Sequence, residues 1–277
     1  MACRKEFQWL AAWGNVDERG EMNIFWVAGG VIFCFMCGVF WRAMAIKNNG
    51  IVDVAYGLAF VLATLITYVI FAVGHPRQVL VLLLIVVWGL RLALHIHARN
   101  KGRGEDFRYR AWREEWGDTF VWRSFLQIYM LQGAVIWVVL APVVLVVNDA
   151  GAGLGVLDVL GVLVWLVGFG FEALGDWQLL RFKRNPDNKG RLMTEGLWRF
   201  TRHPNYFGEA TLWWGLFLIA LNVPYGWLAI VSPVTIDFLL LKVSGIPMLE
   251  AKYEGNAEFE SYKARTNAFF PWFPRKD

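Results

Sequence analysis

Residues 194–217 read TEGLWRFTRHPNYFGEATLWWGLF, and within them the chain changes from polar and basic to apolar and aromatic. The apolar half has the composition of a helix that enters a membrane, and the polar half ends at its edge. Six residues with charge or hydrogen-bonding capacity lie around this boundary: Arg199, Arg202, His203, Asn205, Tyr206 and Glu209. Because such groups are costly in hydrocarbon and are retained there for function, they indicate a site at the mouth of a membrane bundle.

The composition of the whole chain supports a membrane location. Of its 277 residues, 57% are hydrophobic and 18% are charged, and the chain contains 16 Trp and 21 Phe. Soluble domains average roughly 45–50% apolar and about 25% charged residues. The excess predicts an integral membrane protein. Because no repeat or low-complexity segment divides the sequence, we expect residues 1–277 to form a single polytopic membrane domain.

Seven apolar runs are long enough, or nearly so, to cross a bilayer, which takes about 20 residues of helix. They cover residues 23–45, 51–73, 78–98, 124–147, 154–180, 206–222 and 226–246. We therefore expect an all-α fold with about seven transmembrane helices. The sixth and seventh runs are the shortest, and a tight re-entrant hairpin is the alternative for them.

The distribution of Lys and Arg predicts the orientation in the membrane. Basic residues concentrate in the loops 99–123 and 181–205, and both loops fall on the side of the C-terminal tail. Because loops rich in Lys and Arg stay in the cytoplasm, the C-terminus is predicted to be cytoplasmic and the N-terminus outside. Arg77 is the exception, since it lies in a loop on the opposite side.

The start of the second span carries a candidate catalytic site. In NNGIVDVAYG, residues 48–57, the side chains of Asn49, Asp53 and Tyr56 fall on one helical face. A carboxylate and a phenol three residues apart can share a hydrogen bond or meet the same ligand, so Asp53 and Tyr56 are candidate catalytic residues. The alternative makes Asn49 a helix N-cap and Asp53 an acidic first-turn residue that complements the helix dipole.

The third and fifth spans carry charges within apolar sequence. Arg91 and His95 share a face, Trp88 lies one turn before them, and Arg91 is deep enough to need a partner. Glu172 and Asp176, four residues apart, repel each other unless cations or donors meet them. The basic residues that follow position 180 can supply those cations. The four His residues of the chain fit no metal site, and we expect no metal.

These groups are predicted to meet in one polar pocket at the cytoplasmic ends of the spans. Its Arg and Lys residues suit an anionic ligand, because a guanidinium binds phosphate through two parallel hydrogen bonds. The chain has neither a Rossmann glycine motif nor a P-loop. A nucleotide in this pocket would therefore be held by helix ends and side chains.

Several segments carry a resemblance to a known family. GDWQLLRFKRNP, GLWRFTRHPNYFGE and YEGNAEFESYKARTNAFFPWFP resemble the C-terminal domain of the steroid 5-alpha-reductase superfamily. NNGIVDVAYGLAF and RNKGRGEDFRYRAWR resemble its bacterial branch, described as a domain of unknown function. The resemblance covers residues 48–277 and implies a seven-helix reductase that uses NADPH. It also implies a bacterial inner membrane, with the cofactor site on the cytoplasmic side.

The resemblance assigns cofactor roles to individual residues. Asn205 and Glu209 match a cofactor-binding pair of the family, Asp176 matches a helix-borne acidic residue, and Arg191 matches an Arg on the phosphate side. Glu172 departs from the pattern, because the family has Asn at that position. The expected cofactor contacts are Glu172, Asp176, Arg191, Arg202, His203, Asn205, Tyr206 and Glu209.

The substrate side departs further from the family. Steroid reductases of eukaryotes place a Gln-Glu pair and a Tyr at the substrate carbonyl, but this chain has no Gln-Glu pair, and Trp88 lies near the Tyr position. Asp53 is the nearest acidic equivalent, and Tyr56 would supply the phenol that stabilises an enolate oxygen. Asn49, Trp88 and Arg91 are the expected substrate contacts. We therefore expect a lipid-soluble enone or related C=C substrate rather than a steroid.

Two other functions fit part of the sequence. Membrane methyltransferases that use S-adenosylmethionine share the RHP-x-Y block, but they usually carry a Glu-Glu pair where this chain has Leu249, Glu250 and Ala251. A cationic sulfonium also suits a basic pocket less well. The third possibility is a non-catalytic lipid-binding protein. The expected partners are the lipid bilayer and a lipid-soluble small molecule, without nucleic acid, and the oligomeric state stays open.

Overall fold

The computed structural model describes residues 23–102 and 104–275, and its regular structure there is entirely helical. The first half contains α2 (Ile24–Ile46), α3 (Ile51–Phe71), α4 (Pro76–Asn100), α5 (Phe107–Trp116), α6 (Phe120–Arg123), α7 (Leu131–Val139) and α8 (Ala141–Asn148). The second half contains α9 (Val156–Arg184), α10 (Pro204–Ala220), α11 (Val231–Phe238), α12 (Ile246–Glu250) and α13 (Ala257–Arg265). The all-α prediction is confirmed for the described residues.

Five helical segments of the described chain are long and apolar enough to cross a membrane: α2, α3, α4, α9 and the segment Gly226–Tyr253, which contains α11 and α12. A sixth span forms if Phe107–Val139 and α8, which meet at a bend of 49°, count as one crossing. The chain is therefore a multi-pass membrane protein, with five or six candidate spans in its described part.

The expected span 206–222 corresponds to α10, which has 17 residues and is shorter than the roughly 20 that a crossing takes. The count of seven is therefore not confirmed. The expected outside location of the N-terminus concerns residues 1–22, which lie outside the described residues.

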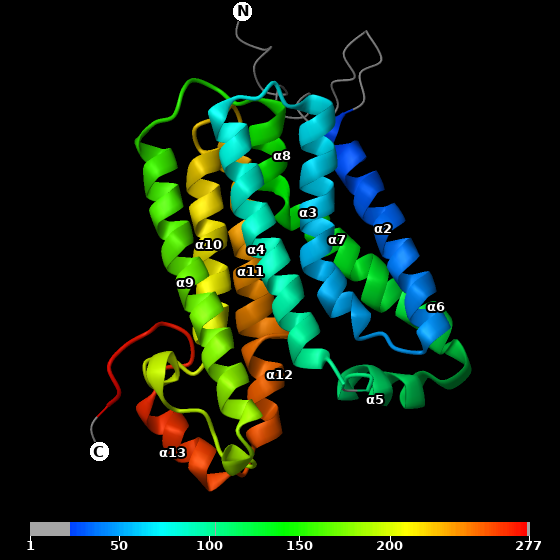
Figure 1. Cartoon of the computed structure of the whole chain (residues 1–277), viewed down its shortest axis with the longest axis vertical. Helices are drawn as coiled ribbons and strands as arrows, with labels where there is room; N and C mark the ends of the chain where they lie inside the picture. The colour runs from blue at the N-terminus through cyan, green and yellow to red at the C-terminus, as the bar shows by residue number, and fades with distance from the viewer. Residues whose placement is uncertain (1–22, 103, 276–277) are drawn as a thin grey trace, which may run out of the picture.

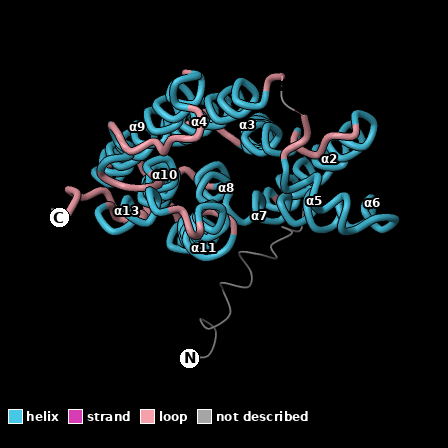
Figure 2. Tube along the Cα trace, turned by 90° about the horizontal axis from the view of Figure 1, so that it is seen from below, coloured by secondary structure: helices cyan, strands magenta, loops and turns pink. Residues whose placement is uncertain are grey.

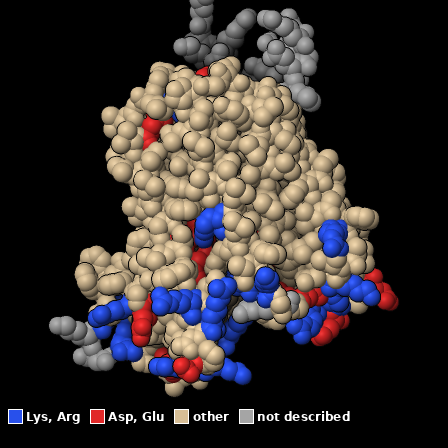
Figure 3. Space-filling view, in the orientation of Figure 1, with Lys and Arg blue, Asp and Glu red and all other residues tan. Residues whose placement is uncertain are grey.

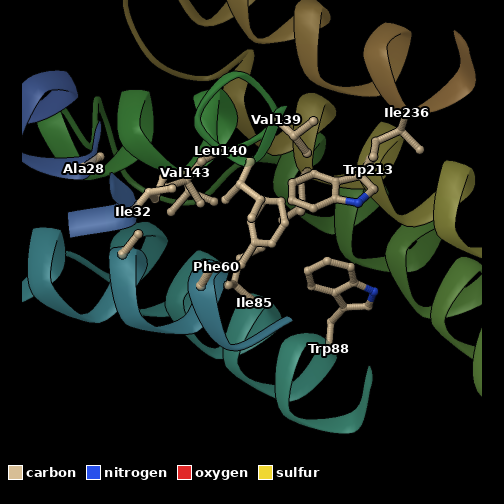
Figure 4. Close-up of a cluster of buried hydrophobic side chains, with 14 of the residues drawn as sticks. Ala28, Ile32, Phe60, Ile85, Trp88, Val139, Leu140, Val143, Trp213 and Ile236 are labelled. Atoms are coloured by element: carbon tan, nitrogen blue, oxygen red, sulfur yellow. The ribbon is translucent and has the colours of Figure 1, made fainter. Parts of the chain in front are cut away.

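The helices form two rows when the molecule is seen from below (Figure 2). The helices α9, α4, α3 and α2 follow one another along one side, and α10, α8 and α7 lie behind them with α11. An aromatic core joins the rows: the rings of Phe60, Trp88 and Trp213 are fully buried, and each pair of ring centroids is 5.2 Å apart (Figure 4). This core lies directly beside the charged groups described below, because the indole of Trp88 also donates a hydrogen bond to one of them, Glu172.

The pair α9 and α10 packs more closely than ordinary side chains allow (Figure 1). A Cβ added to Gly168 would lie 2.4 Å from the backbone nitrogen of Leu212, and one added to Gly208 would lie 2.3 Å from that of Glu172. Small residues of this kind let two helix backbones approach within a membrane. The contact brings the polar start of α10 against Glu172.

Charged side chains gather at the end of the bundle that carries α5 and α13, whereas the surface above them is almost entirely uncharged (Figure 3). The loops 99–123 and 181–205 and the C-terminal α13 all lie at this end (Figure 1). The expectation that the two basic loops share a side with the C-terminal tail therefore agrees with the fold.

Arg77, the basic residue on the opposite side, has a structural partner. Its Nε donates to Asp158 at 2.8 Å, and its other nitrogens donate to the carbonyls of Ala152 and Gly153 at 2.8 Å. Arg77 and Asp158 are 1% and 2% exposed. This buried pair satisfies the charge within the protein, so Arg77 does not act as an orienting surface charge.

Candidate functional site

A buried ion network connects α4 to α9 near the charged end. Arg91 Nη1 lies 2.7 Å from Asp176 Oδ2, and Arg91 Nη2 forms a second ion pair with Glu172. The Glu172 and Asp176 side chains are only 3% and 9% exposed. The expected cations after position 180 are therefore not the partners of these carboxylates, because Arg91, from another helix, takes that place.

Two neutral donors complete the network. The indole Nε1 of Trp88 donates to Glu172 at 3.0 Å, and the amide of Asn205 donates to Asp176 at 3.2 Å. We call these five residues (Trp88, Arg91, Glu172, Asp176 and Asn205) the Arg91 cluster. His95 lies beside it, with Nε2 3.7 Å from Asp176. All five residues of the Arg91 cluster are predicted site residues, and they come from three helices, α4, α9 and α10.

Glu209 lies one helical turn after Asn205 and is half-buried. Its carboxylate lies close enough to Arg91 and Asp176 for electrostatic interaction, yet it makes no hydrogen bond or ion pair within the described part of the chain. Arg91 therefore faces two bound carboxylates and one that lacks a partner. The interior of the site is acidic, contrary to the predicted basic pocket.

Arg202 and His203 face the C-terminal part of the chain. Arg202 donates to both oxygens of Glu250, at 2.9 and 3.1 Å, and also to the Thr266 carbonyl. His203 Nε2 lies 2.9 Å from Glu250, and its ring stacks on Tyr206 with centroids 5.4 Å apart. The Arg202 guanidinium and His203 Nε2 thus bind the protein itself, and the cofactor role of these two residues stays a prediction.

Asp53 binds a different partner from the expected one. Its Oδ1 accepts from the Tyr109 hydroxyl at 2.6 Å, and its Oδ2 accepts from Arg108 at 3.1 Å. Tyr56 instead packs edge-on against Phe60 and Trp88. The predicted pairing of Asp53 with Tyr56 is therefore not formed, and Asp53 holds α5 against α3.

The side chain of Asn49 also forms hydrogen bonds within the protein. Its side chain donates to Ser124 at 3.3 Å and accepts from the Tyr129 hydroxyl at 3.0 Å, and the residue is fully buried. The N-cap of α3 is Gly50, so the N-cap reading of Asn49 is wrong. These bonds hold the 124–130 segment on α3, and the predicted contact with a substrate does not follow from them.

Exposed basic residues surround the acidic interior. Arg191 and Arg199 are exposed on the segment between α9 and α10, and Arg181 and Arg184 are exposed at the end of α9. Arg191 makes no ion pair with any described residue. Guanidinium groups at this place can meet the phosphates of a ligand whose other end reaches the Arg91 cluster.

No three His, Cys, Asp or Glu side chains in the described ranges are arranged to hold a metal ion. The site consists instead of carboxylates, one guanidinium and hydrogen-bond donors at the charged end of an apolar bundle.

The fold and this site define a multi-pass helical membrane protein with a charged interior cluster. A family model described as "protein of unknown function (DUF1295)" matches residues 39–266, and the chain belongs to this family. The match is consistent with the resemblance to the steroid 5-alpha-reductase-like branch. Comparison with curated proteins gave no match, and comparison with solved structures gave none.

Proposed function

We propose that this protein is a membrane-embedded, NADPH-dependent reductase of a lipid-soluble enone or related C=C substrate. The supporting observation is the convergence of Asp176, Asn205 and Glu209, which come from α9 and α10 and are the positions that the family resemblance links to the cofactor. They meet beside Arg91, at the end of the bundle where exposed Arg residues are available for phosphates.

The residues present fit a bound dinucleotide in one specific respect. At this site, two buried or half-buried polar groups have no hydrogen-bond partner among the described residues: the Glu209 carboxylate and Arg91 Nε. Unpaired polar groups of this kind are costly inside a protein, and a ligand that supplies donors and acceptors would satisfy them. Asn205, Asp176 and Glu209 would hold the sugar and ring portions, and Arg191 would meet the phosphates.

The reaction would need a donor on the membrane side of the cluster. NADPH, when bound, supplies the hydride. Tyr56 lies next to Trp88 and near Glu172 and Glu209, and its phenol can donate a hydrogen bond to a developing enolate oxygen. The buried rings of Phe60, Trp88 and Trp213 would keep water away from that oxygen.

One observation favours a second candidate, a methyltransferase that uses S-adenosylmethionine. The interior of the site carries more carboxylates than cations, and a cationic sulfonium suits such surroundings better than the basic pocket that the sequence predicts. The Glu-Glu pair of those enzymes remains missing, and the single Glu250 is bound by Arg202 and His203.

Cofactor binding separates these candidates. NADPH and S-adenosylmethionine should each be titrated into the purified protein and followed by tryptophan fluorescence or calorimetry. We expect NADPH to bind, and Glu209→Gln and Arg191→Ala to weaken it by about ten-fold to a hundred-fold, the usual result of losing a charge-assisted contact. Arg265→Ala, an exposed Arg on α13, is the matched control.

The other outcomes decide against a reductase. Binding of S-adenosylmethionine without any response to NADPH supports the methyltransferase. Binding of neither compound by a folded protein supports a non-catalytic lipid-binding role.

A further inference from the structure

An apolar groove of about 510 Å³ lies between α2 and α3, away from the Arg91 cluster. Its walls include Phe35, Gly38 and Val39 of α2, Val54 and Leu58 of α3, and His97 near the end of α4. Both helices are candidate membrane spans, and the groove is lined by the parts of them that lie toward the charged end of the bundle. Gly38 is exposed, and a side chain added there would meet open space.

A second, polar pocket of about 420 Å³ continues the groove toward the charged end. The two cavities share Ile51, Val54 and His97 as lining residues, so they lie next to each other. The walls of the polar pocket come mainly from residues 99–101 and 104–110, at the end of α4 and the start of α5 and between them. The two adjacent cavities therefore offer an apolar part along the candidate spans and a polar part beside the charged end.

The acidic residues of the polar pocket are already neutralised. Glu105 accepts two hydrogen bonds from Arg113, at 2.8 and 3.0 Å, and Asp106 accepts two from Arg108, from its backbone N and its Nε, each at 3.0 Å. Burial acts to raise the pKa of Asp106, but hydrogen bonds from the side chain and backbone of Arg108 hold that pKa below its usual value. Neither carboxylate is thus available to the cations across the pocket.

The cations that line the two cavities have no such partner. Arg99, Lys101 and Arg110 line the polar pocket, and Arg42 lines the groove. Within residues 23–102 and 104–275, none of these four forms an ion pair with a carboxylate. Positive charge that no ion pair in the described residues neutralises, beside an apolar groove, matches a molecule with an anionic head and an apolar tail.

We propose that the groove and the polar pocket together bind an anionic phospholipid. The phosphate lies among Arg99, Lys101 and Arg42, and one acyl chain follows the groove between α2 and α3. Basic pockets between membrane helices bind anionic headgroups by the same physics, in which attraction to the phosphate adds to burial of the chain. The site is separate from the Arg91 cluster and does not depend on the proposed reductase activity.

The test compares two lipids that differ in headgroup charge. The purified full-length protein should be placed in detergent micelles with equal amounts of phosphatidylglycerol and phosphatidylcholine of identical acyl chains. Bound lipid is then counted by native mass spectrometry. We expect the wild-type protein to retain phosphatidylglycerol in preference to phosphatidylcholine. The double variant Arg99→Gln/Lys101→Gln should lower that retention by roughly five-fold or more, because two headgroup contacts are lost.

A second variant tests the groove itself. Gly38→Leu fills the apolar part and should reduce retention of both lipids. Gly30→Leu is the matched control, since Gly30 is also exposed on α2, has open space around it and does not line the groove. Arg265→Gln on α13 is the control for loss of surface charge.

The outcomes are distinct from those of the cofactor experiment. Equal retention of the two lipids by the wild type would overturn the proposal, and so would unchanged retention of phosphatidylglycerol in both the charge and the groove variants. If Gly38→Leu does not fold, the double charge variant decides alone, and thermal unfolding identifies that case.

Discussion

Arg91 shows how the environment of a single residue decides its role. The sequence indicates that Arg91, Glu172 and Asp176 each need a partner, and the structure confirms this need by joining them. The sequence alone does not identify the partners, because Arg91 and Asp176 are 85 positions apart and helical periodicity relates only residues within a few turns. The basic residues nearest in sequence were the wrong choice, since they follow the end of α9 into the exposed loop.

Removal of Arg91 should destabilise the protein strongly. Arg91→Met leaves two buried carboxylates without their cation, and such a change costs roughly 3–5 kcal/mol in the free energy of unfolding. Thermal unfolding in detergent measures the effect, with Arg181→Met as a control that removes an exposed Arg. Addition of Glu172→Gln and Asp176→Asn to Arg91→Met should recover part of the loss. Equal stability of Arg91→Met and Arg181→Met would contradict the network.

Substitutions of Asp53 and Tyr56 are predicted to affect different properties, stability for Asp53 and turnover for Tyr56. Tyr56→Phe removes only the proposed donor, so reductase turnover should fall by roughly 10²–10⁴-fold while NADPH affinity stays unchanged. Asp53→Asn should instead lower stability, by about 1.5–3 kcal/mol, because it weakens hydrogen bonds from Tyr109 and Arg108 to a charged group. Turnover, NADPH binding and thermal unfolding are measured for both variants. Normal turnover in Tyr56→Phe would remove the catalytic assignment.

At the scale of the helices, the sequence predicts only in part which glycines lie at a helix–helix contact. Gly168, Gly170 and Gly175 of α9 all suggest close helix approach. The structure places Gly168 and Gly175 against α10, whereas a Cβ on Gly170 would meet nothing within 4 Å. The sequence does not reveal which face of an apolar helix meets its neighbour when both faces are apolar, because one of them contacts lipid.

These glycines provide a matched pair of variants. Gly168→Ala places a Cβ 2.6 Å from the Gly208 carbonyl, so the helices must separate, and we expect a loss of roughly 1–3 kcal/mol in the free energy of unfolding. Gly170→Ala, two residues away on the open face, should be neutral or slightly stabilising, since Ala favours helix. Thermal unfolding compares the two, and equal losses would argue against the close α9–α10 contact. Binding of NADPH should also weaken in Gly168→Ala alone, because Asn205 moves with α10.

Short and bent helices explain why the span count differs from the expected seven. Apolar composition marks residues 206–222 as a span, but α10 ends at Ala220 and has 17 residues. Residues 124–147 form a π-helical turn followed by α7 and α8 with a bend between the two helices, which composition alone does not reveal. The presence of apolar helices was thus predictable, and their bends and exact ends were not.

The orientation of the whole molecule is open to a direct test. In a variant without the native cysteines, Asp187→Cys lies between α9 and α10 at the charged end, and Ala152→Cys lies between α8 and α9 at the opposite end. We expect a membrane-impermeant maleimide to label Ala152→Cys in intact cells and to label Asp187→Cys only after lysis, because basic loops stay in the cytoplasm. The reverse pattern would invert the orientation and place the candidate site outside.

The bonds between the start of α10 and the C-terminal tail have a consequence for biosynthesis. Arg202 N donates to the Asn267 carbonyl at 2.9 Å, and the Thr201 hydroxyl donates to the Phe269 carbonyl at 2.8 Å. Asn267 and Phe269, which accept these bonds, are synthesised well after α10. Every earlier helix can be inserted during translation, but the loop that precedes Asn205 cannot reach its final structure until residues 267–269 have left the ribosome. A nascent chain stalled before residue 266 therefore carries all the side chains of the Arg91 cluster and lacks the contacts that fix one edge of it.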